Sequence, residues 1–187
     1  MKLQKLALLA GVAVFAASAM LAGCSKSSGG EQVGGPGELA DEALVTYQAP
    51  GGAFSFQHPK SWTEEKDKNG NVRFAGRDAF VGVEIRSDDG KDMTAYATND
   101  AATVANDFAG YQEISIKGST EVTGAVILTF EWDAGQSTVT GKDVRAHVDR
   151  YYIPESNGRV AIMTGSEPVS AFDRETVRDV ALTVTVN

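Results

Sequence analysis

From residue 53 onward, apolar and polar residues alternate in short stretches, which is the pattern of half-buried β-strands. Asn69-Gly70 and Asn157-Gly158 are typical of tight hairpin turns between such strands. Pro59 ends the first stretch because proline has no backbone N–H to donate to a neighbouring strand. The predicted strands cover residues 53–58, 72–75, 79–86, 111–116, 122–132, 144–153 and 159–164.

Two other stretches repeat their apolar residues at helical spacing. The first stripe consists of Met93, Ala97, Ala101, Val104 and Phe108. Asp92 is suited to cap the start of this helix, and Gly110 is suited to the position just past its end. The second stripe consists of Phe172, Val177, Val180 and Ala181, and Ser170 to Asp173 ahead of it resembles a capping box. Residues 182–186 either end this helix or add a short strand.

The arrangement of these elements predicts the fold class. Residues 122–132 and 159–164 carry apolar side chains on both faces, which indicates central strands covered on two sides. Most strands are expected to pair with their neighbours in the sequence. We therefore predict a single α+β domain, in which an antiparallel β-sheet of about six to seven strands packs against helices.

The first 24 residues have the organisation of an export signal. Lys2 and Lys5 precede an apolar run over residues 6–20, which is shorter than the ~20 residues that a membrane-spanning helix needs. The run ends in Leu21-Ala22-Gly23-Cys24, which resembles the lipobox of bacterial lipoproteins. The resemblance implies cleavage between Gly23 and Cys24 and attachment of a diacylglyceryl group to the Cys24 sulfur. The alternative is an ordinary signal peptide with a chance cysteine.

These features divide the chain into three parts. Residues 1–23 form the signal peptide, residues 24–44 form a flexible Ser/Gly-rich linker that begins with the lipidated Cys24, and residues 45–187 form the α+β domain. We expect the protein in the cell envelope, anchored through Cys24 to the extracytoplasmic side of a membrane. Whether that membrane is an inner or an outer one stays open.

Charge and cysteine content exclude several classes of partner. Cleavage after Gly23 removes two lysines and no acidic residue, which changes the formal charge from −8 to −10. An acidic protein repels phosphate backbones, so nucleic acid is not expected as a partner. Once Cys24 is lipidated, the domain has no thiol for a disulfide or a cysteine metal site. His58 and His147 are far apart in the sequence, and we expect no metal and no other cofactor.

The opening of the domain resembles a known family. Phe54-Ser55-Phe56-Gln57-His58-Pro59-Lys60-Ser61-Trp62, the order of the elements and the run from Phe172 to Val186 are similar to the PsbP-like fold. This family includes the extrinsic P protein of photosystem II, a Ran-binding nuclear import factor and bacterial lipoproteins of the LpqN type. The resemblance implies an antiparallel sheet sandwiched between helices and a role in binding or assembly. Phe54, Phe56 and Trp62 are expected to be core residues.

One polar cluster is a candidate for chemistry. Alternation places Arg145, His147, Asp149 and Tyr151 on one face of a strand, where a His–Asp pair could act as a base and its orienting group. The alternative interpretation is a water-exposed strand face on which Arg145, His147 and Asp149 form a surface cluster of opposite charges. No serine lies in a recognisable nucleophile motif, and we assign no catalytic residue.

Three functions are compatible with this sequence. The first is a non-enzymatic envelope lipoprotein that binds an unknown protein or small ligand, and a deep pocket holding strongly shifted titratable groups would count against it. The second is an envelope hydrolase that uses His147 and Asp149 with a hydroxyl nucleophile in hydrogen-bonding reach. The third is a docking subunit of a larger membrane complex, which requires a contiguous exposed apolar patch.

Overall fold

The computed structural model describes residues 43–67, 71–88, 90, 92–156 and 158–187. Cys24 and Gly23 lie outside these residues, as do the predicted signal peptide, nearly all of the linker and the Asn69-Gly70 turn. In chain order the elements are β1 (Leu44–Gln48), η1 (Pro50–Gly52), β2 (Phe54–Pro59), β3 (Thr63–Lys66), β4 (Val72–Ala75), β5 (Phe80–Ser87), α1 (Met93–Asp107), β6 (Gln112–Gly118), β7 (Val126–Gln136), β8 (Asp143–Glu155), β9 (Arg159–Pro168), α2 (Arg174–Leu182) and β10 (Thr185–Val186).

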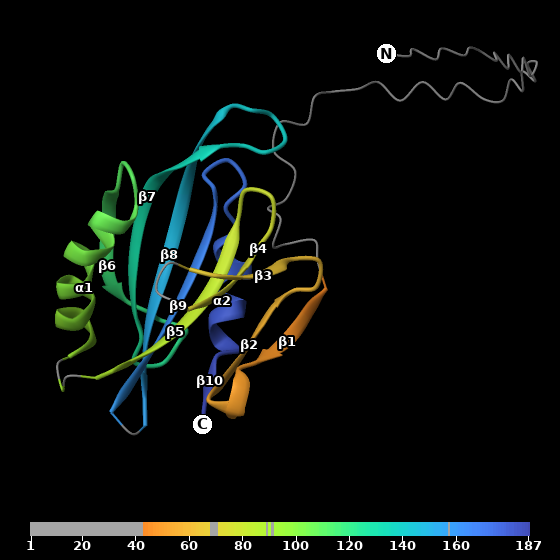
Figure 1. The fold of residues 1–187 in the computed structure, drawn as a ribbon. Helices are drawn as coiled ribbons and strands as arrows, with labels where there is room; N and C mark the ends of the chain where they lie inside the picture. The colour runs from red at the N-terminus through yellow and green to blue at the C-terminus, as the bar shows by residue number, and fades with distance from the viewer. Residues whose placement is uncertain (1–42, 68–70, 89, 91, 157) are drawn as a thin grey trace, which may run out of the picture. The chain divides into compact units, whose positions relative to one another are not determined.

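A seven-stranded sheet forms the centre of the domain (Figure 1). Its strands follow the order β3-β4-β5-β9-β8-β7-β6, and every neighbouring pair is antiparallel. This confirms the predicted α+β class and the antiparallel sheet. The β5–β9 pair joins segments far apart in the sequence and brings the β3–β4 hairpin next to the long C-terminal strands. The candidate site described below lies beside this junction.

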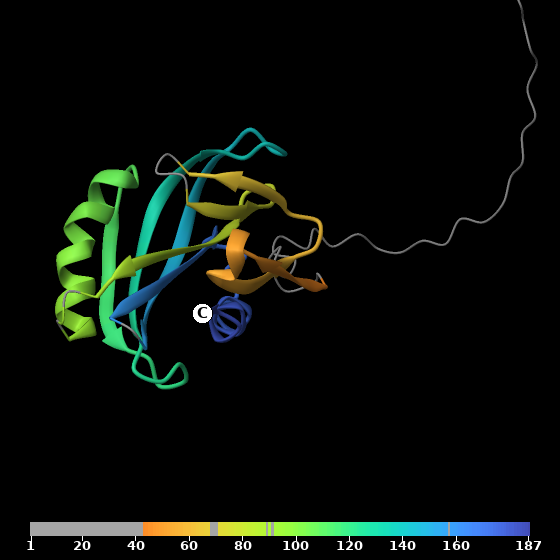
Figure 2. The same ribbon diagram turned by 60° about the horizontal axis from the view of Figure 1, so that its bottom comes forward.

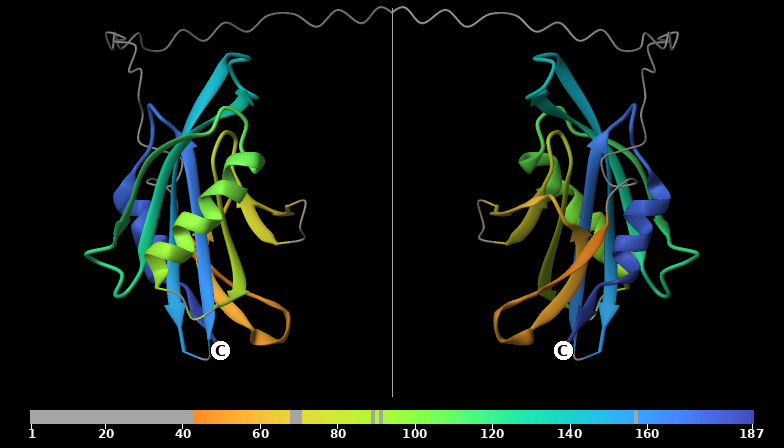
Figure 3. Two further views of the ribbon diagram at one scale, coloured as in Figure 1. Left: turned by 90° about the vertical axis from the view of Figure 1, so that its left-hand side faces the viewer. Right: turned by 90° about the vertical axis from the view of Figure 1, so that its right-hand side faces the viewer.

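Helix α1 packs on one face of the sheet, as Figure 3 shows. The Asp92 side chain accepts hydrogen bonds from the backbone N–H groups of Thr94 and Ala95, so the predicted cap is confirmed. Gly110 has a φ of 61°, which suits the sharp turn after the helix. The helix contacts β6, β7 and β8. It buries Ala97, Ala101, Val104, Val126, Leu128, Phe130, Val148, Tyr152, Val160 and Ile162 in one core cluster.

The opposite face carries α2 and a second sheet, which Figure 2 shows as a separate layer. This sheet has the order β1-β2-β10. Phe56 and Trp62 are buried between it and the large sheet, which confirms them as core residues, whereas Phe54 is only partly buried and packs against the same cluster. The expected sheet between helices is met only in part, because α2 shares this face with three strands. The sequence analysis missed β1, which covers the last residue of the predicted linker and the first four residues of the predicted domain.

Several element boundaries also differ from the prediction. β7 begins at Val126 and runs to Gln136, whereas the predicted strand covers residues 122–132. β3 was not predicted, because all four of its residues are exposed and three are charged, so it has no apolar face. The predicted capping box at Ser170 is wrong. Helix α2 starts at Arg174, and the Asp173 side chain caps it by accepting from the backbone N–H groups of Glu175 and Thr176.

A close approach of backbone and side chain fixes α2 on the sheet. Gly165 lies on β9 beneath the helix, and a Cβ atom added there would be 2.6 Å from Val177 Cγ1. Gly118 on β6 is a matched contrast, because an added Cβ meets nothing within 4 Å. Glycine is therefore required at position 165 for packing and not for backbone conformation.

We predict that Gly165→Ala lowers the free energy of unfolding by about 1–3 kcal/mol, because the methyl group overpacks the contact with Val177. Gly118→Ala should change it by no more than about 0.5 kcal/mol. Urea denaturation of both variants measures the difference. Adding Val177→Ala to Gly165→Ala should recover part of the lost stability. Equal free energies of unfolding for Gly165→Ala and Gly118→Ala would contradict the packing argument.

Candidate functional site

The structure places the predicted polar cluster on the face of β8 that is turned toward α2. The Asp149 side chain is 0% exposed and accepts hydrogen bonds from the Thr129 hydroxyl at 2.7 Å and from Arg174 Nε at 2.8 Å. His147 Nε2 lies 3.4 Å from Arg174 Nη2 and 3.7 Å from Asp149 Oδ1, and its ring contacts Phe172. The water-exposed surface cluster is therefore wrong for Asp149, because Arg174 and its neighbours cover this part of the strand.

Arg145 belongs to a different set of contacts. Its guanidinium donates to the Asp133 carboxylate at 2.7 Å and to the Gly110 carbonyl at 3.0 Å, and it also contacts Glu131 and Gln112. These bonds tie β8 to β7 and to the turn between α1 and β6. None of these four partners is His147 or Asp149, so Arg145 stands apart from the predicted His–Asp pair.

The pKa of Asp149 reflects this enclosure. Burial raises the pKa of the carboxyl group, but His147, Thr129 and the charge of Arg174 outweigh burial and lower the pKa below its usual value. The Thr129 hydroxyl donates to Asp149 and not to His147. The hydroxyl nucleophile that the hydrolase hypothesis requires is therefore not supplied by this hydroxyl.

A cavity of about 400 Å³ lies on the opposite face of the sheet. Helix α1 forms one wall of the cavity, residues of β5 and β9 form the floor, and the β3–β4 hairpin forms the far wall. Gly82 is part of the floor, opposite Arg73 on β4 and Thr164 on β9 in the strand register. A Cβ atom added at Gly82 would lie 3.0 Å from Arg73 Cβ and 3.2 Å from the Val72 carbonyl oxygen, so glycine allows β4 and β5 to approach closely here.

One end of the cavity is ionic. The Arg150 side chain is only 8% exposed and pairs with Glu84 on β5 and with Asp100 on α1. It also donates to the Thr164 hydroxyl at 2.6 Å. Arg86 contacts the same two carboxylates, at 2.9 Å to Glu84 and 2.6 Å to Asp100. Two arginines and two carboxylates thus neutralise one another, and the pairing joins α1 to β5 and β8.

The other end of the cavity is aromatic. Phe80, Phe108 and Trp132 line it, together with Val104 and Ile162. The Trp132 indole Nε1 donates to Ser166 Oγ at 3.2 Å, and its ring meets Phe108 edge to face at a centroid distance of 5.0 Å. The hydrogen bond fixes the indole across the sheet. The cavity therefore offers a ligand a rigid apolar wall beside a set of charges.

The pKa values in the ionic end are shifted toward the charged forms. Burial raises the pKa of Asp100, but the charges of Arg150 and Arg86 outweigh it and lower the pKa. Burial lowers the pKa of Arg150, but Tyr152 and the two carboxylates raise it above its usual value. Tyr152 keeps its proton, because burial raises its pKa. None of these three groups exchanges a proton near neutral pH.

The sequence analysis did not identify this cavity. Arg150 could have indicated a buried ionic site, since it alternates with the buried residues Val148 and Tyr152 on one face of β8. Its partners Glu84 and Asp100 are 66 and 50 residues away in the chain, so only the fold reveals the pairing. His147, which the sequence did single out, is not among the residues that line the cavity.

Four other features of the described residues bear on function: the metal-ligating side chains, the length of the helices, a buried histidine and the exposed apolar side chains. No group of three or more His, Cys, Asp or Glu side chains in this part of the chain is placed to hold a metal ion. Neither described helix is long and apolar enough to pass through a membrane. His58 is buried and stacks on Phe74, and burial lowers its pKa. The exposed large apolar side chains come from four separate segments: Ile114, Val139, Val169 and Leu182.

Comparison with solved structures identifies the fold. The domain is similar to the solution structure of cyanobacterial PsbP (CyanoP) from Synechocystis, with a TM-score of 0.51 and 17% identity, over 83% of this chain and 99% of that chain. It is also similar to the Ran-binding protein Mog1p of Saccharomyces cerevisiae, with a TM-score of 0.53 and 9% identity, over 78% and 96%. No protein-family model and no curated protein matches the sequence. At these identities the likeness shows a PsbP-like fold alone.

We predict that Arg150→Met lowers the free energy of unfolding by about 3–5 kcal/mol, because it leaves Glu84 and Asp100 with too little positive charge inside the domain. Arg73→Met is the matched control. Arg73 is 40% exposed and pairs with Glu65 at the surface, so its loss should cost less than about 1 kcal/mol. Chemical denaturation of both variants gives the comparison, and a similar cost for the two would show that the buried network contributes little.

Proposed function

We propose that this protein is a membrane-anchored lipoprotein of the cell envelope, and that its PsbP-like domain is a non-enzymatic binding module. The observation that carries the proposal is the cavity between α1 and the β3–β4 hairpin. Its volume of about 400 Å³ lies within the range of small-molecule sites, and its wall combines apolar rings with a few convergent polar groups. The proposed ligand is therefore a small molecule.

Shifted titratable groups in a pocket are the feature that would count against a binding module, so the direction of the shifts in this cavity matters. A pocket with shifted titratable groups can mark an enzyme, because acid–base catalysis needs groups that exchange protons near the working pH. In this cavity Asp100 and Arg150 are both held in their charged forms. Such groups orient a ligand and fix α1 on the sheet, but they do not serve as general acids or bases.

The alternative functions have less support. A hydrolase based on His147 and Asp149 would work on the face covered by the start of α2, where the Thr129 hydroxyl is committed to Asp149. A docking subunit would present a continuous apolar patch, and only four large apolar side chains are exposed among the described residues: Ile114, Val139, Val169 and Leu182. We therefore favour the cavity as the functional site.

The proposed location rests on the first 24 residues. Leu21-Ala22-Gly23-Cys24 follows a basic and then apolar leader, and lipidation at Cys24 would attach the domain to the membrane surface. The PsbP-like fold is compatible with this placement, since the sequence resembles LpqN-type lipoproteins in its opening motif. Lipid and small ligand are thus the partners that we propose, and nucleic acid is not among them.

Filling the cavity tests the binding function. Thr103 is an exposed residue of α1 that lines the cavity, and Ala105 is an exposed residue of the same helix that does not. With the neutral probe naphthylacetamide, we expect the amide NMR signals of Gly82 and Thr164 to shift in the wild-type domain. Thr103→Phe should abolish these shifts because the ring occupies the space of the probe.

Ala105→Phe is the control and should keep the shifts. The amide of Val177, on the other side of the sheet, should stay in place in all three proteins. Absence of probe-dependent shifts at Gly82 and Thr164 in the wild type, or equal shifts in Thr103→Phe, would refute the cavity as a ligand site.

Substitution of the proposed lipidation residue tests the location. In detergent phase partitioning of cell extracts, the wild-type protein should enter the detergent phase, and Cys24→Ser should stay in the aqueous phase because no acyl chain is attached. Ser25→Ala is the control next to it and should partition like the wild type. Partitioning of Cys24→Ser into detergent would rule out the proposed anchor.

A further inference from the structure

The cavity has few free hydrogen-bond acceptors at its ionic end. Glu84 accepts three hydrogen bonds from arginine side chains and a fourth from Asn71 at 3.4 Å. Asp100 accepts two from arginine side chains and one from the Tyr152 hydroxyl at 2.9 Å. A carboxylate offers about four acceptor sites, so both groups are close to saturation. A ligand that brings additional donors would find little to bind here.

Four basic residues (Lys66, Arg73, Arg86 and Arg150) and four acidic residues (Asp67, Glu84, Asp100 and Asp107) line the cavity. Two of the arginines have N–H groups beyond those that their ion pairs use. A guanidinium has about five N–H donors. Arg86 makes three hydrogen bonds, and its side chain is 36% exposed. Arg73 directs Nε and Nη2 to a single oxygen of Glu65, at 3.0 and 2.8 Å, and is 40% exposed. The unused N–H groups favour a ligand that brings acceptors, preferably with a negative charge.

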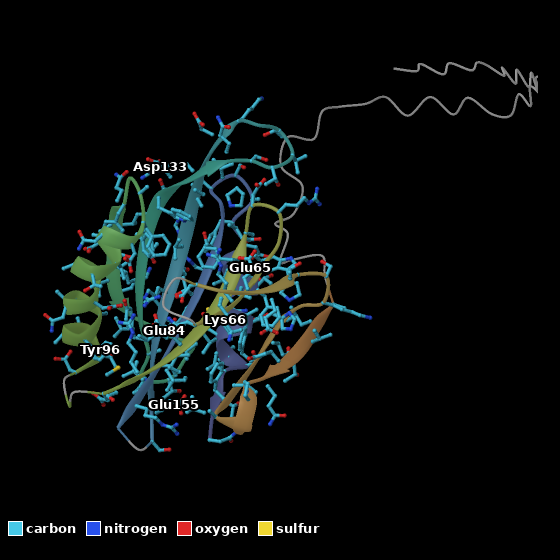
Figure 4. The ribbon with its side chains drawn as sticks, viewed as in Figure 1. Glu65, Lys66, Glu84, Tyr96, Asp133 and Glu155 are labelled. Carbon is cyan, nitrogen blue, oxygen red and sulfur yellow. The ribbon has the colours of Figure 1, made fainter. Side chains whose placement is uncertain are left out.

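Arg73 is the best placed of these donors. It stands opposite Gly82 in the strand register, and its guanidinium carbon lies 5.3 Å from the centroid of the Phe80 ring. It therefore lies beside Gly82 on the cavity floor and next to the aromatic end. Its partner Glu65 belongs to the edge strand β3, is 43% exposed and forms a surface pair, which is weakly held. Figure 4 labels Glu65 on the hairpin and Glu84 on β5.

We propose, on the basis of the binding function above, that the ligand is a small amphipathic carboxylic acid. Its apolar body lies against Phe80, Phe108 and Trp132, and its carboxylate accepts hydrogen bonds from Arg73. A single negative charge suits the site better than a phosphate, because the chain without residues 1–23 has a formal charge of −10 and repels each further negative charge.

Two probes with the same apolar body test this ligand class. Naphthylacetate carries a carboxylate, and naphthylacetamide carries a neutral amide of similar size. By calorimetric titration we expect the acid to bind the wild-type domain about tenfold more tightly than the amide, since hydrogen bonds to charged groups are the stronger ones. Arg73→Met should reduce the affinity for the acid to that for the amide. Glu65→Gln should increase the affinity for the acid, because it frees Arg73 from its competing carboxylate.

Arg178→Met is the matched control for the loss of one arginine. Arg178 lies on α2, on the other side of the sheet, and its removal should leave both affinities unchanged. Equal affinities for acid and amide, with both lost in Thr103→Phe, would overturn the acidic ligand and leave the cavity as the ligand site. Absence of binding by either probe would overturn the ligand class together with the proposed function.

Discussion

A guanidinium that has lost its contact with water must be neutralised by carboxylates held at fixed positions, and Arg150 imposes this requirement on the domain. One carboxylate comes from β5 and the other from α1, so the charge balance is complete only when the helix lies against this part of the sheet. Apolar packing alone is not directional. The ion pairs therefore fix the position of α1, and the cavity wall depends on that position.

The two faces of the large sheet differ because α2 packs directly on its face, whereas α1 leaves a cavity beside it. Over Gly165, α2 comes so close that no side chain fits between helix and strand, and the polar group of Asp149 is enclosed nearby. The 15-residue helix α1 packs on β6, β7 and β8 and shares a core cluster with Val160 and Ile162 of β9. The cavity lies between this helix and the β3–β4 hairpin, with residues of β5 and β9 as its floor. The fold places the closed face and the open face back to back, with the functional candidate on the open one.

Periodicity predicted the elements that have a strong apolar face and failed where that face is absent. The stripe from Met93 to Phe108 gave α1 and its Asp92 cap, whereas the charged strand β3 has no apolar side chain to reveal it. The cavity could not be predicted in this way. It depends on the pairing of Arg150 with residues more than 40 positions away, which are contacts that no local pattern encodes.

The second sheet determines how the first described strand is held. β1 pairs with β2 from Leu44 opposite Pro59 to Gln48 opposite Ser55. Leu44 and Tyr47 also pack against the core cluster, and the centroid of the Tyr47 ring lies 5.3 Å from that of Phe74 on β4. The entry strand is therefore secured twice, by its backbone ladder and by aromatic packing that reaches the same β3–β4 hairpin that walls the cavity.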